Sequence, residues 1–314
     1  MRGRGQIRRI LGNINYVMPD PAIPYREVPC RVRGRLRIQE TGETTLTCVG
    51  DWVEFRYDPG KGELGLIERV LPRQSVLVRR SAGESIKADP IVANADQLAI
   101  VVAPAPDIRP GIVDRYLVGA YAGGLEVIVV VNKIDLPQTK KGLDLVQSIY
   151  GPLGTRVIAT SALYGDGCME LFRLLSGRTT VLSGHSGVGK STLINTLYGL
   201  RIRTREVRED MRGRHTTTHT EMHKVGNGTW VIDTPGIRSF GLVGVHPTEL
   251  DDYFPDFGPY RGECRFSDCT HREEPGCAVR EAVEAGAIAP SRYESYLEFF
   301  NELNEVLPEW ERVR

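Results

Sequence analysis

A glycine-rich segment in the middle of the chain constrains its fold more than any other feature. The sequence VLSGHSGVGKSTLINTL, residues 181–197, passes from an apolar strand pattern through a turn into a helix pattern. Its Gly184–Ser191 portion fits GxxxxGK[ST], in which glycines let successive backbone N–H groups point inward while the following helix aims its positive dipole end at the same place. The segment therefore predicts a phosphate-binding loop for a nucleoside triphosphate.

The residues of this loop have separate expected roles. Lys190 would bridge the outer phosphates, which makes it a candidate catalytic residue, and Ser191 would offer its hydroxyl to magnesium. An ordinary glycine-rich turn is the alternative, and the flanking strand and helix patterns disfavour it. The predicted nucleotide contacts are Gly184, His185, Ser186, Gly187, Val188, Gly189, Lys190, Ser191 and Thr192.

Two further segments are expected to serve the phosphates and the metal. WVIDTPGIRSF places Asp233 at the end of an apolar strand, where its carboxylate can hold magnesium through a water, and places Gly236 where its N–H can contact the terminal phosphate. The polar stretch GRHTTTHT fits a segment that the terminal phosphate orders, with a threonine reaching the metal. Thr216, Thr217 and Thr218 are equivalent by sequence, and Thr218 is taken as the magnesium ligand.

Guanine is the expected base. Asn132-Lys133-Ile134-Asp135 follows the strand pattern LEVIVVV and fits NKxD, whose carboxylate accepts hydrogen bonds from the guanine N1–H and N2 amino group, an edge that adenine does not present. Another strand pattern ends in Thr160-Ser161-Ala162, the usual backbone contact to the base oxygen. The predicted base contacts are Asn132, Lys133, Asp135, Ser161 and Ala162.

The order of these motifs differs from that of an ordinary GTPase. GTPases normally run from the phosphate loop through the switch threonine and DxxG to NKxD and SA, whereas this chain runs NKID, TSA, GHSGVGKS, HTTT, DTPG. Each motif follows its own strand, so the spatial arrangement survives if the old termini are joined and new ones are opened in surface loops. We therefore expect a circularly permuted GTPase domain.

The chain divides into three blocks. Residues 1–85 contain short alternating segments such as DWVEFRYD and GLIERVL, which predict a small antiparallel barrel. Residues 86–245 alternate apolar runs with helical stretches, as in a parallel sheet covered by helices. Residues 246–314 contain a cysteine cluster and two segments with helical apolar spacing, AVREAVEAG and SRYESYLEFFNELNEVL.

The third block contains a compact set of metal ligands, Cys264, Cys269, His271 and Cys277, within 14 residues. Three thiolates and an imidazole suit a closed, tetrahedral structural zinc site. Because the block reads as poor in apolar residues, zinc would supply much of its folding energy. Disulfide pairing is the alternative, disfavoured by the absence of an export signal. The remaining cysteines, expected to be buried small hydrophobes, are Cys30, Cys48 and Cys168.

The first block contains a regular row of arginines. In CRVRGRLRI, period two places Arg31, Arg33, Arg35 and Arg37 on one face of a strand, with Val32, Leu36 and Ile38 turned inward. Such a basic face suits a nucleic-acid phosphate backbone. A solvated face with scattered ion pairs is the alternative.

With these motifs in this order, the chain strongly resembles the circularly permuted GTPases of the ribosome small-subunit-dependent GTPase A family (RsgA, also called YjeQ or YloQ). The resemblance covers nearly the whole chain, through GHSGVGKST, GRHTTT, DTPGIRSF and the cysteine cluster followed by CAVREAVEAG and RYESYL. It implies a multidomain fold: an N-terminal OB-fold β-barrel that binds RNA, a central circularly permuted α/β P-loop GTPase domain, and a C-terminal zinc-binding domain with helices.

The resemblance also implies an activity and partners. The implied reaction is hydrolysis of GTP to GDP and phosphate, stimulated by the small (30S) ribosomal subunit during its late maturation. The implied cofactors are Mg²⁺ and one structural Zn²⁺ per chain, and the implied partners are the subunit, its 16S-type rRNA and other assembly factors, with the protein acting as a monomer. Two alternatives stay open: a GTP-dependent RNA-binding switch, and a GTPase serving a non-ribosomal partner.

One motif position predicts slow unaided turnover. Ile237 stands where many GTPases carry a glutamine that orients the attacking water, and an apolar side chain cannot do so. His215, immediately before the threonine run, is the candidate catalytic replacement that the family pattern also nominates. A solvent-facing loop histidine is the alternative reading of His215.

Charge and hydropathy limit the partners and the cellular location that the sequence allows. The formal net charge is zero, but residues 246–314 carry 7 basic and 16 acidic side chains, so the two ends of the chain should meet different partners. No apolar run approaches the roughly 18–20 residues that span a bilayer, and the Arg-rich start MRGRGQIRRI lacks an apolar signal core. We expect a cytoplasmic protein with no membrane partner.

Overall fold

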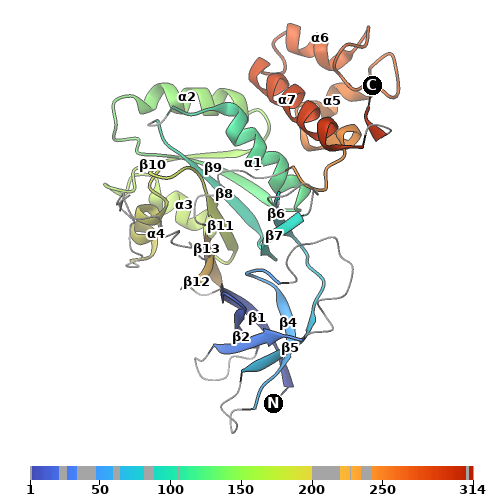
Figure 1. The fold of residues 1–314 in the computed structure, drawn as a ribbon. Coiled ribbons are helices and arrows are strands. Elements are labelled where there is room, and N and C mark those ends of the chain that lie inside the picture. The colour runs from blue at the N-terminus through green and yellow to red at the C-terminus, as the bar shows by residue number, and fades with distance from the viewer. Residues whose placement is uncertain are drawn as a thin grey trace, which may run out of the picture.

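The computed structural model describes residues 2–20, 27–33, 47–58, 64–80, 88–104, 107–199, 220–226, 228–234, 242–308 and 311–313. Figure 1 shows three parts: an N-terminal barrel, a central sheet flanked by helices, and a C-terminal helical block. Within the described residues the strands form an 11-stranded sheet and a 2-stranded sheet.

The barrel is closed by hydrogen bonding of its first strand on both sides. Its strands are β1 (Arg2–Leu11), β2 (Ile14–Asp20), β3 (Val28–Val32), β4 (Trp52–Arg56) and β5 (Gly65–Val70). β1 pairs with both β2 and β4, β2 pairs with β3, and β5 joins β3 to β4. Alternate residues face inward, as period two requires, and the buried core is Ile7, Val17, Val28, Cys30, Val53, Phe55 and Ile67. The predicted OB-type barrel is confirmed, but the expectation that it is antiparallel throughout is wrong, because β3 and β5 pair in parallel.

The central sheet is parallel, as the apolar runs predict. Its order is β10 (Arg156–Thr160), β9 (Glu126–Asn132), β8 (Gln97–Val102), β11 (Thr179–Ser183), β13 (Thr229–Asp233) and β12 (Glu221–Gly226), with only β12 antiparallel among these described strands. Buried side chains alternate along β8, so that Leu98 and Ile100 lie on one face while Ala99 and Val101 lie on the other.

Two helices cover each face of this sheet (Figure 1). The side with Leu98 is packed by α1 (Pro110–Ala122) and α2 (Thr139–Tyr150), and the side with Ala99 by α3 (Cys168–Leu175) and α4 (Lys190–Tyr198). Because every parallel strand is covered on both faces, its sequence is a nearly continuous apolar run. This explains why EVIVVVN shows no alternation.

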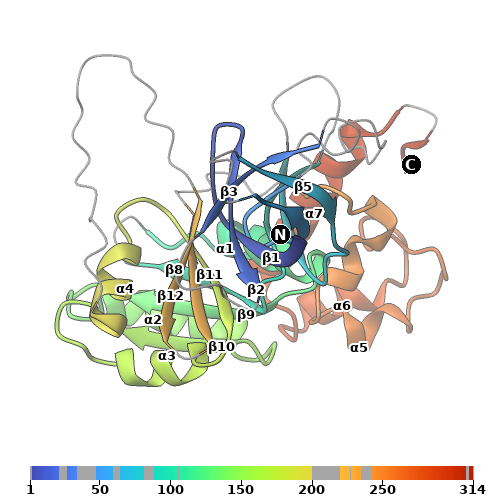
Figure 2. The same cartoon turned by 90° about the horizontal axis from the view of Figure 1, so that it is seen from below.

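The barrel and the central sheet share backbone pairing. β1 pairs antiparallel with β12 through Arg9 and Glu221, and both views place these strands side by side (Figures 1 and 2). At this junction the buried Arg8 guanidinium lies 3.5 Å from the ring centroid of Trp230 in β13, and its Nη1 donates to Met222 Sδ at 2.7 Å. The barrel is therefore a continuation of the sheet.

A separate hairpin crosses the expected boundary between the first two blocks. Its strands are β6 (Val76–Arg80) and β7 (Ala88–Ala93), and the predicted division between residues 85 and 86 falls between them. Leu77 and Val92 from this hairpin pack into the same apolar cluster as α1 and α2. The division into 1–85, 86–245 and 246–314 stays a prediction.

The C-terminal block has an apolar core of its own. Its elements are the 3₁₀ helix η2 (Pro247–Tyr253), α5 (Gly258–Arg261), α6 (Ala278–Glu284) and α7 (Pro290–Val306). The core includes closely packed aromatic rings, among them Phe254 and Phe257, whose centroids lie 5.1 Å apart, and Phe254 and Tyr296, at 5.4 Å. The expectation of little apolar content in this block is therefore wrong, because α7 contributes Tyr296, Phe299 and Phe300 and the segment between η2 and α5 contributes Phe254 and Phe257.

A buried charge network fastens this block to the central part. Arg292 of α7 donates to Asp114 of α1 and to Asp256, each at 2.8 Å, and Arg292 and Asp114 are 0% exposed. Ser295 and Tyr150 also donate to Asp114, at 2.5 and 2.9 Å. Burial raises the pKa of Asp114 and the Arg292 charge opposes that shift. The network satisfies a charge pair that neither part could bury alone.

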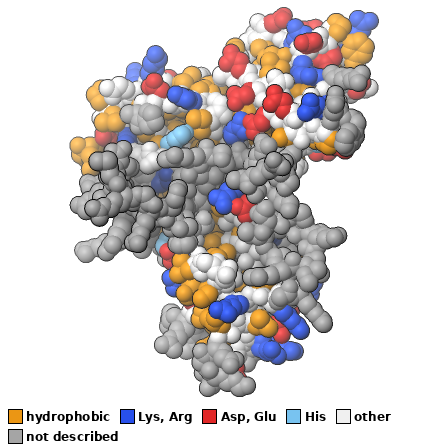
Figure 3. Space-filling model, viewed as in Figure 1, with side chains coloured by type: hydrophobic (Ala, Val, Ile, Leu, Met, Phe, Trp, Pro, Cys, Tyr) orange, Lys and Arg blue, Asp and Glu red, His pale blue; other side chains and the backbone are white. Residues whose placement is uncertain are grey.

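Charge is unevenly spread over the surface. Figure 3 shows acidic side chains gathered over the C-terminal block and Lys and Arg side chains on the barrel.

In the part of the chain that the structure describes, no helix combines the length and apolar character needed to cross a bilayer.

Candidate nucleotide and metal sites

The motif residues lie at the ends of neighbouring parallel strands. β9 ends at Asn132, β10 at Thr160, β11 at Ser183 and β13 at Asp233. Carboxyl ends of parallel strands meet at one edge of a sheet, where α/β proteins bind ligands. The four motifs described here are therefore neighbours in space, whatever their order along the chain.

Asn132 joins the guanine-reading loops to the phosphate loop. Its side chain is buried, and its Nδ2 donates to the Val188 carbonyl at 2.8 Å across 56 residues of sequence. Its Oδ1 accepts from the Ala162 N–H and from the Thr160 hydroxyl, both at 3.1 Å. The hydrogen bonds of this one side-chain amide thus fix the positions of three loops relative to one another.

Asp135 is placed to present its carboxylate outward. It is exposed, and its Oδ1 accepts a 2.6 Å hydrogen bond from the Ser161 hydroxyl, which fixes the orientation of the group. Lys133 adopts a φ of 66°, rare for a residue with a side chain, and its carbonyl accepts from the Thr139 hydroxyl at 2.7 Å. A fixed, solvent-facing carboxylate suits recognition of a base edge.

The phosphate loop requires glycine at two of its positions. A Cβ at Gly184 would collide with the Val101 carbonyl, and a Cβ at Gly189 would collide with the Asn132 side-chain amide. Both residues have positive φ, 144° and 96°, which glycine adopts without steric strain. Gly189 caps α4, so Lys190, Ser191 and Thr192 form the first turn of that helix.

Lys190 and Asp233 lie at the centre of the site. The Lys190 ammonium donates to the carbonyls of Gly184 and His185 at 2.7 and 3.1 Å. Burial lowers the pKa of Lys190 while Asp233 raises it, and burial raises the pKa of Asp233 while Lys190 lowers it. Opposite charges in a partly desolvated site are suited to bind phosphates and a divalent cation together.

Three threonines with no predicted role of their own tie the loops together. Thr160 donates to Asn132, Thr196 of α4 donates to the Ala162 carbonyl at 2.7 Å, and Thr234 donates to the Leu182 carbonyl at 3.0 Å. Thr160 and Thr234 lie inside the TSA and DTPG motifs, which is a usable signal. Thr196 carries no such signal, because its partner is distant in sequence.

Some predicted site residues lie outside the described residues: His215, Thr218, Gly236, Arg35 and Arg37. The other predicted nucleotide residues lie on or beside the loops described above, with the His185 and Ser186 side chains exposed. Arg31 and Arg33 are exposed around the partly buried Val32, as the alternation in that strand predicts.

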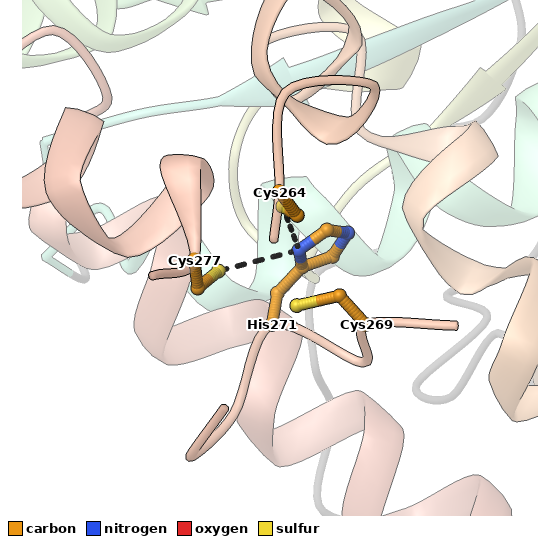
Figure 4. Close-up of side chains that lie close together, drawn as sticks. All are labelled: Cys264, Cys269, His271 and Cys277. Atoms are coloured by element: carbon orange, nitrogen blue, oxygen red, sulfur yellow. Dashed lines mark hydrogen bonds between the residues drawn. The ribbon is translucent and has the colours of Figure 1, made fainter. Parts of the chain in front are cut away.

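The four predicted metal ligands come together in the C-terminal block (Figure 4). Their ligand atoms all lie within 4.8 Å of one another, and His271 Nδ1 is 3.6 Å from Cys264 Sγ and 3.4 Å from Cys277 Sγ. Tetrahedral zinc with Zn–S bonds of about 2.3 Å would separate its sulfurs by roughly 3.8 Å. The three thiols and one imidazole therefore fit this metal.

The surroundings of the cluster orient its histidine. His271 Nε2 lies 3.6 Å from Asp251 Oδ2, and the His271 carbonyl accepts from the Tyr293 hydroxyl at 2.8 Å. A carboxylate on the second ring nitrogen directs the first toward the thiols. Burial raises the pKa of Cys269 to about 12, and burial raises that of Cys277. A bound cation would supply the positive charge that thiolates at these positions need.

The fold and the motif order define a circularly permuted GTPase. The RsgA GTPase family model matches residues 70–243. The chain belongs to this family, and it is therefore a GTP hydrolase.

Relatives match over most of the chain. The small ribosomal subunit biogenesis GTPase RsgA of Moorella thermoacetica is 41% identical over 304 residues, 95% of this chain and 97% of that protein. The protein of the same name from Gemmatimonas aurantiaca is 43% identical over 277 residues, 87% of this chain and 89% of that protein. Among solved structures, YjeQ from Thermotoga maritima matches with a TM-score of 0.74 and 34% identity, covering 96% of this chain and 99% of its own. YloQ, described as a circularly permuted GTPase, matches with a TM-score of 0.71 and 27% identity, covering 98% and 97%.

Proposed function

We propose that this protein binds the small ribosomal subunit and acts in its late maturation, hydrolysing GTP to GDP and phosphate with turnover that the subunit stimulates. The observation that carries the nucleotide part is the Asn132 side chain, which joins the guanine-reading and phosphate loops into one site. The ribosomal part is supported by relatives named as small ribosomal subunit biogenesis GTPases that match nearly the whole chain. A cytoplasmic monomer belongs to the same proposal.

The proposed guanine contacts surround the Asp135 carboxylate, which Ser161 orients. The proposed phosphate contacts are the amides of the loop and the Lys190 ammonium, which lies at the loop carbonyls. Lys190 would stabilise charge that develops on the transferring phosphoryl group. The full set proposed for GTP is Asn132, Lys133, Asp135, Ser161, Ala162, residues 184–192, Asp233 and Gly236.

Magnesium would be held by Ser191, Asp233 and Thr218, and when bound it supplies positive charge to the outer phosphates. His215 would position the attacking water, since Ile237 cannot. Zinc would be held by the four C-terminal ligands as a structural ion. RNA would be contacted by Arg31, Arg33, Arg35 and Arg37.

The decisive experiment measures phosphate release from GTP and from ATP, with and without purified small ribosomal subunits. We expect slow release from GTP alone, a marked increase with subunits, and little release from ATP. Lys190→Ala is the control that removes phosphate binding. Equal turnover of GTP and ATP would refute the guanine assignment, and subunits without effect would refute the ribosomal one.

Co-sedimentation with small subunits distinguishes nucleotide-dependent binding of the subunit from GTP hydrolysis. We expect retention with a non-hydrolysable GTP analogue and release with GDP. His215→Ala should keep GTP-dependent sedimentation and lose stimulated hydrolysis. Full stimulated turnover in that variant would exclude His215 from catalysis.

A further inference from the structure

A cavity opens at the amino ends of the parallel strands. This is the edge of the sheet opposite the nucleotide site. Its volume is about 390 Å³, and its walls come from the first residues of β8, β9 and β10, the segment before β10 and the carboxyl end of α3. None of the residues proposed for GTP, magnesium, zinc or the barrel arginines lines it. The cavity is therefore separate from every site described above.

The cavity is positively charged. Arg156, Arg173 and Arg178 line it, together with a single acidic residue, Glu126. Arg178 donates to Glu126 at 2.5 Å and to the Gln97 side-chain oxygen at 3.2 Å, so these two charges offset each other. Within the described ranges, the exposed side chains of Arg156 and Arg173 make no hydrogen bond or ion pair. Two guanidinium groups thus line the cavity with no counter-ion among the described residues.

A buried hydroxyl in the cavity wall also lacks a partner. Thr155 is 8% exposed, and its Oγ1 makes no hydrogen bond to any described residue. The neighbouring Gln97 amide is already satisfied, because its Nε2 donates to the Leu174 carbonyl and to the Thr180 hydroxyl. Buried hydroxyls without partners are uncommon and unfavourable. Its Oγ1 has almost no accessible surface, so a ligand in the cavity does not contact it, and the polar contacts to a ligand come from the arginines.

We infer that this cavity binds a phosphodiester of single-stranded RNA. Arginine forks match phosphate oxygens in geometry as well as charge, and the volume accommodates a phosphate with its sugar. The inference rests on the proposed function, since the RNA it places here belongs to the small ribosomal subunit. Because the cavity lies away from the nucleotide edge, it adds affinity for the subunit and leaves the chemistry of GTP hydrolysis unchanged.

The test compares the full-length wild type with Arg156→Ala/Arg173→Ala in co-sedimentation with small subunits across a salt series. We expect about tenfold weaker binding and a salt slope smaller by about one to two, as loss of phosphate contacts requires. GTP turnover without subunits should be unchanged. The matched control is Lys140→Ala/Lys141→Ala, which removes two exposed cations from α2 outside this cavity; it should bind as the wild type does.

Each contrary result has a distinct meaning. Wild-type affinity and slope in the arginine variant would overturn the inference. Equal weakening in the lysine variant would also overturn it, by showing that net charge alone matters. If the wild type itself does not sediment with subunits in any nucleotide state, the proposed function fails instead.

Two small ligands test whether the bound phosphate belongs to an RNA strand or to a free nucleotide. An octanucleotide of uridine should bind in a manner that depends on Arg156 and Arg173, whereas uridine monophosphate, which the guanine site does not read, should bind far more weakly. Equal or tighter binding of the monophosphate would overturn the assignment to an RNA strand. Thr155→Val changes only this enclosed hydroxyl, so it should bind the octanucleotide as the wild type does.

Discussion

The nucleotide edge and the cysteine cluster are assembled in opposite ways. At the nucleotide edge, residues from distant segments meet because parallel strands end together, and Asn132 bonds to a carbonyl 56 residues away. In the C-terminal block, four ligands within one short segment converge beside an aromatic core. A site built on strand order survives reordering of the chain, whereas a site built on local spacing depends on that one segment.

Removing zinc should separate the two regions most clearly. With the metal chelated, or in Cys277→Ser, we expect the C-terminal block to melt in its own transition at lower temperature, while the central domain unfolds in a second transition and keeps its GTP affinity. Calorimetry and a nucleotide titration measure both. Cys30→Ala, in the barrel core, should keep one zinc per chain. Loss of GTP binding on chelation would contradict the separation.

Arg292→Ala tests the connection between the regions. The substitution leaves the buried Asp114 without its cation, and we expect a loss of about 3–5 kcal/mol in the free energy of unfolding, measured by chemical denaturation. Arg115→Ala, which breaks a more exposed pair with Glu302 at the same interface, should lose about 1 kcal/mol or less.

The Arg292→Ala loss should depend on pH. Burial raises the pKa of Asp114, and without the Arg292 charge only the hydrogen bonds from Ser295 and Tyr150 oppose that shift. A carboxyl whose folded pKa exceeds its unfolded pKa loses stability as the pH rises through that interval. The variant should therefore lie closer to the wild type in acid than at neutral pH. A loss of unfolding free energy of equal size at acidic and neutral pH would contradict the explanation by a buried, unpaired charge.

Asn132→Ala tests the long-range assembly of the nucleotide edge. It leaves the Val188 carbonyl and the Ala162 N–H without their partner, and we expect a loss of about 1–3 kcal/mol in stability with weaker binding of both GTP and GDP. Denaturation and fluorescent nucleotide titration are the measurements. Wild-type stability with normal nucleotide affinity would show that the loops do not depend on this amide.

Asp135→Ala should have the smallest effect on stability and a specific effect on recognition. Its carboxylate is exposed but accepts from the buried Ser161 hydroxyl, so the free energy of unfolding should fall by about 1 kcal/mol. The preference for GTP over ATP should fall about 10- to 100-fold, because the carboxylate hydrogen bonds to guanine are lost. Retained preference, measured by competition between the two nucleotides, would place base recognition elsewhere.

The sequence predicts local features well and long-range contacts poorly. The parallel strands, the closed barrel and helices α6 and α7 follow from apolar period and turn residues, and the four metal ligands follow from their spacing. The bond from Asn132 to Val188, the pairing of β1 with β12 and the contact of Arg292 with Asp114 join residues far apart in the chain, where no periodicity links them. The aromatic core of the last block joins the rings of α7, whose apolar spacing is visible in the sequence, to Phe254 and Phe257 far earlier in the chain, and that long-range contact has no signal in the sequence.

The pairing of β1 with β12 connects the amino-terminal barrel to the nucleotide edge through the backbone. β12 lies between β1 and β13, whose last residue is Asp233, so the first strand of the chain is connected to that carboxylate through one β1–β12 residue pair and the longer β12–β13 ladder. Removing β1 would therefore leave β12 as an unpaired sheet edge, one strand away from β13.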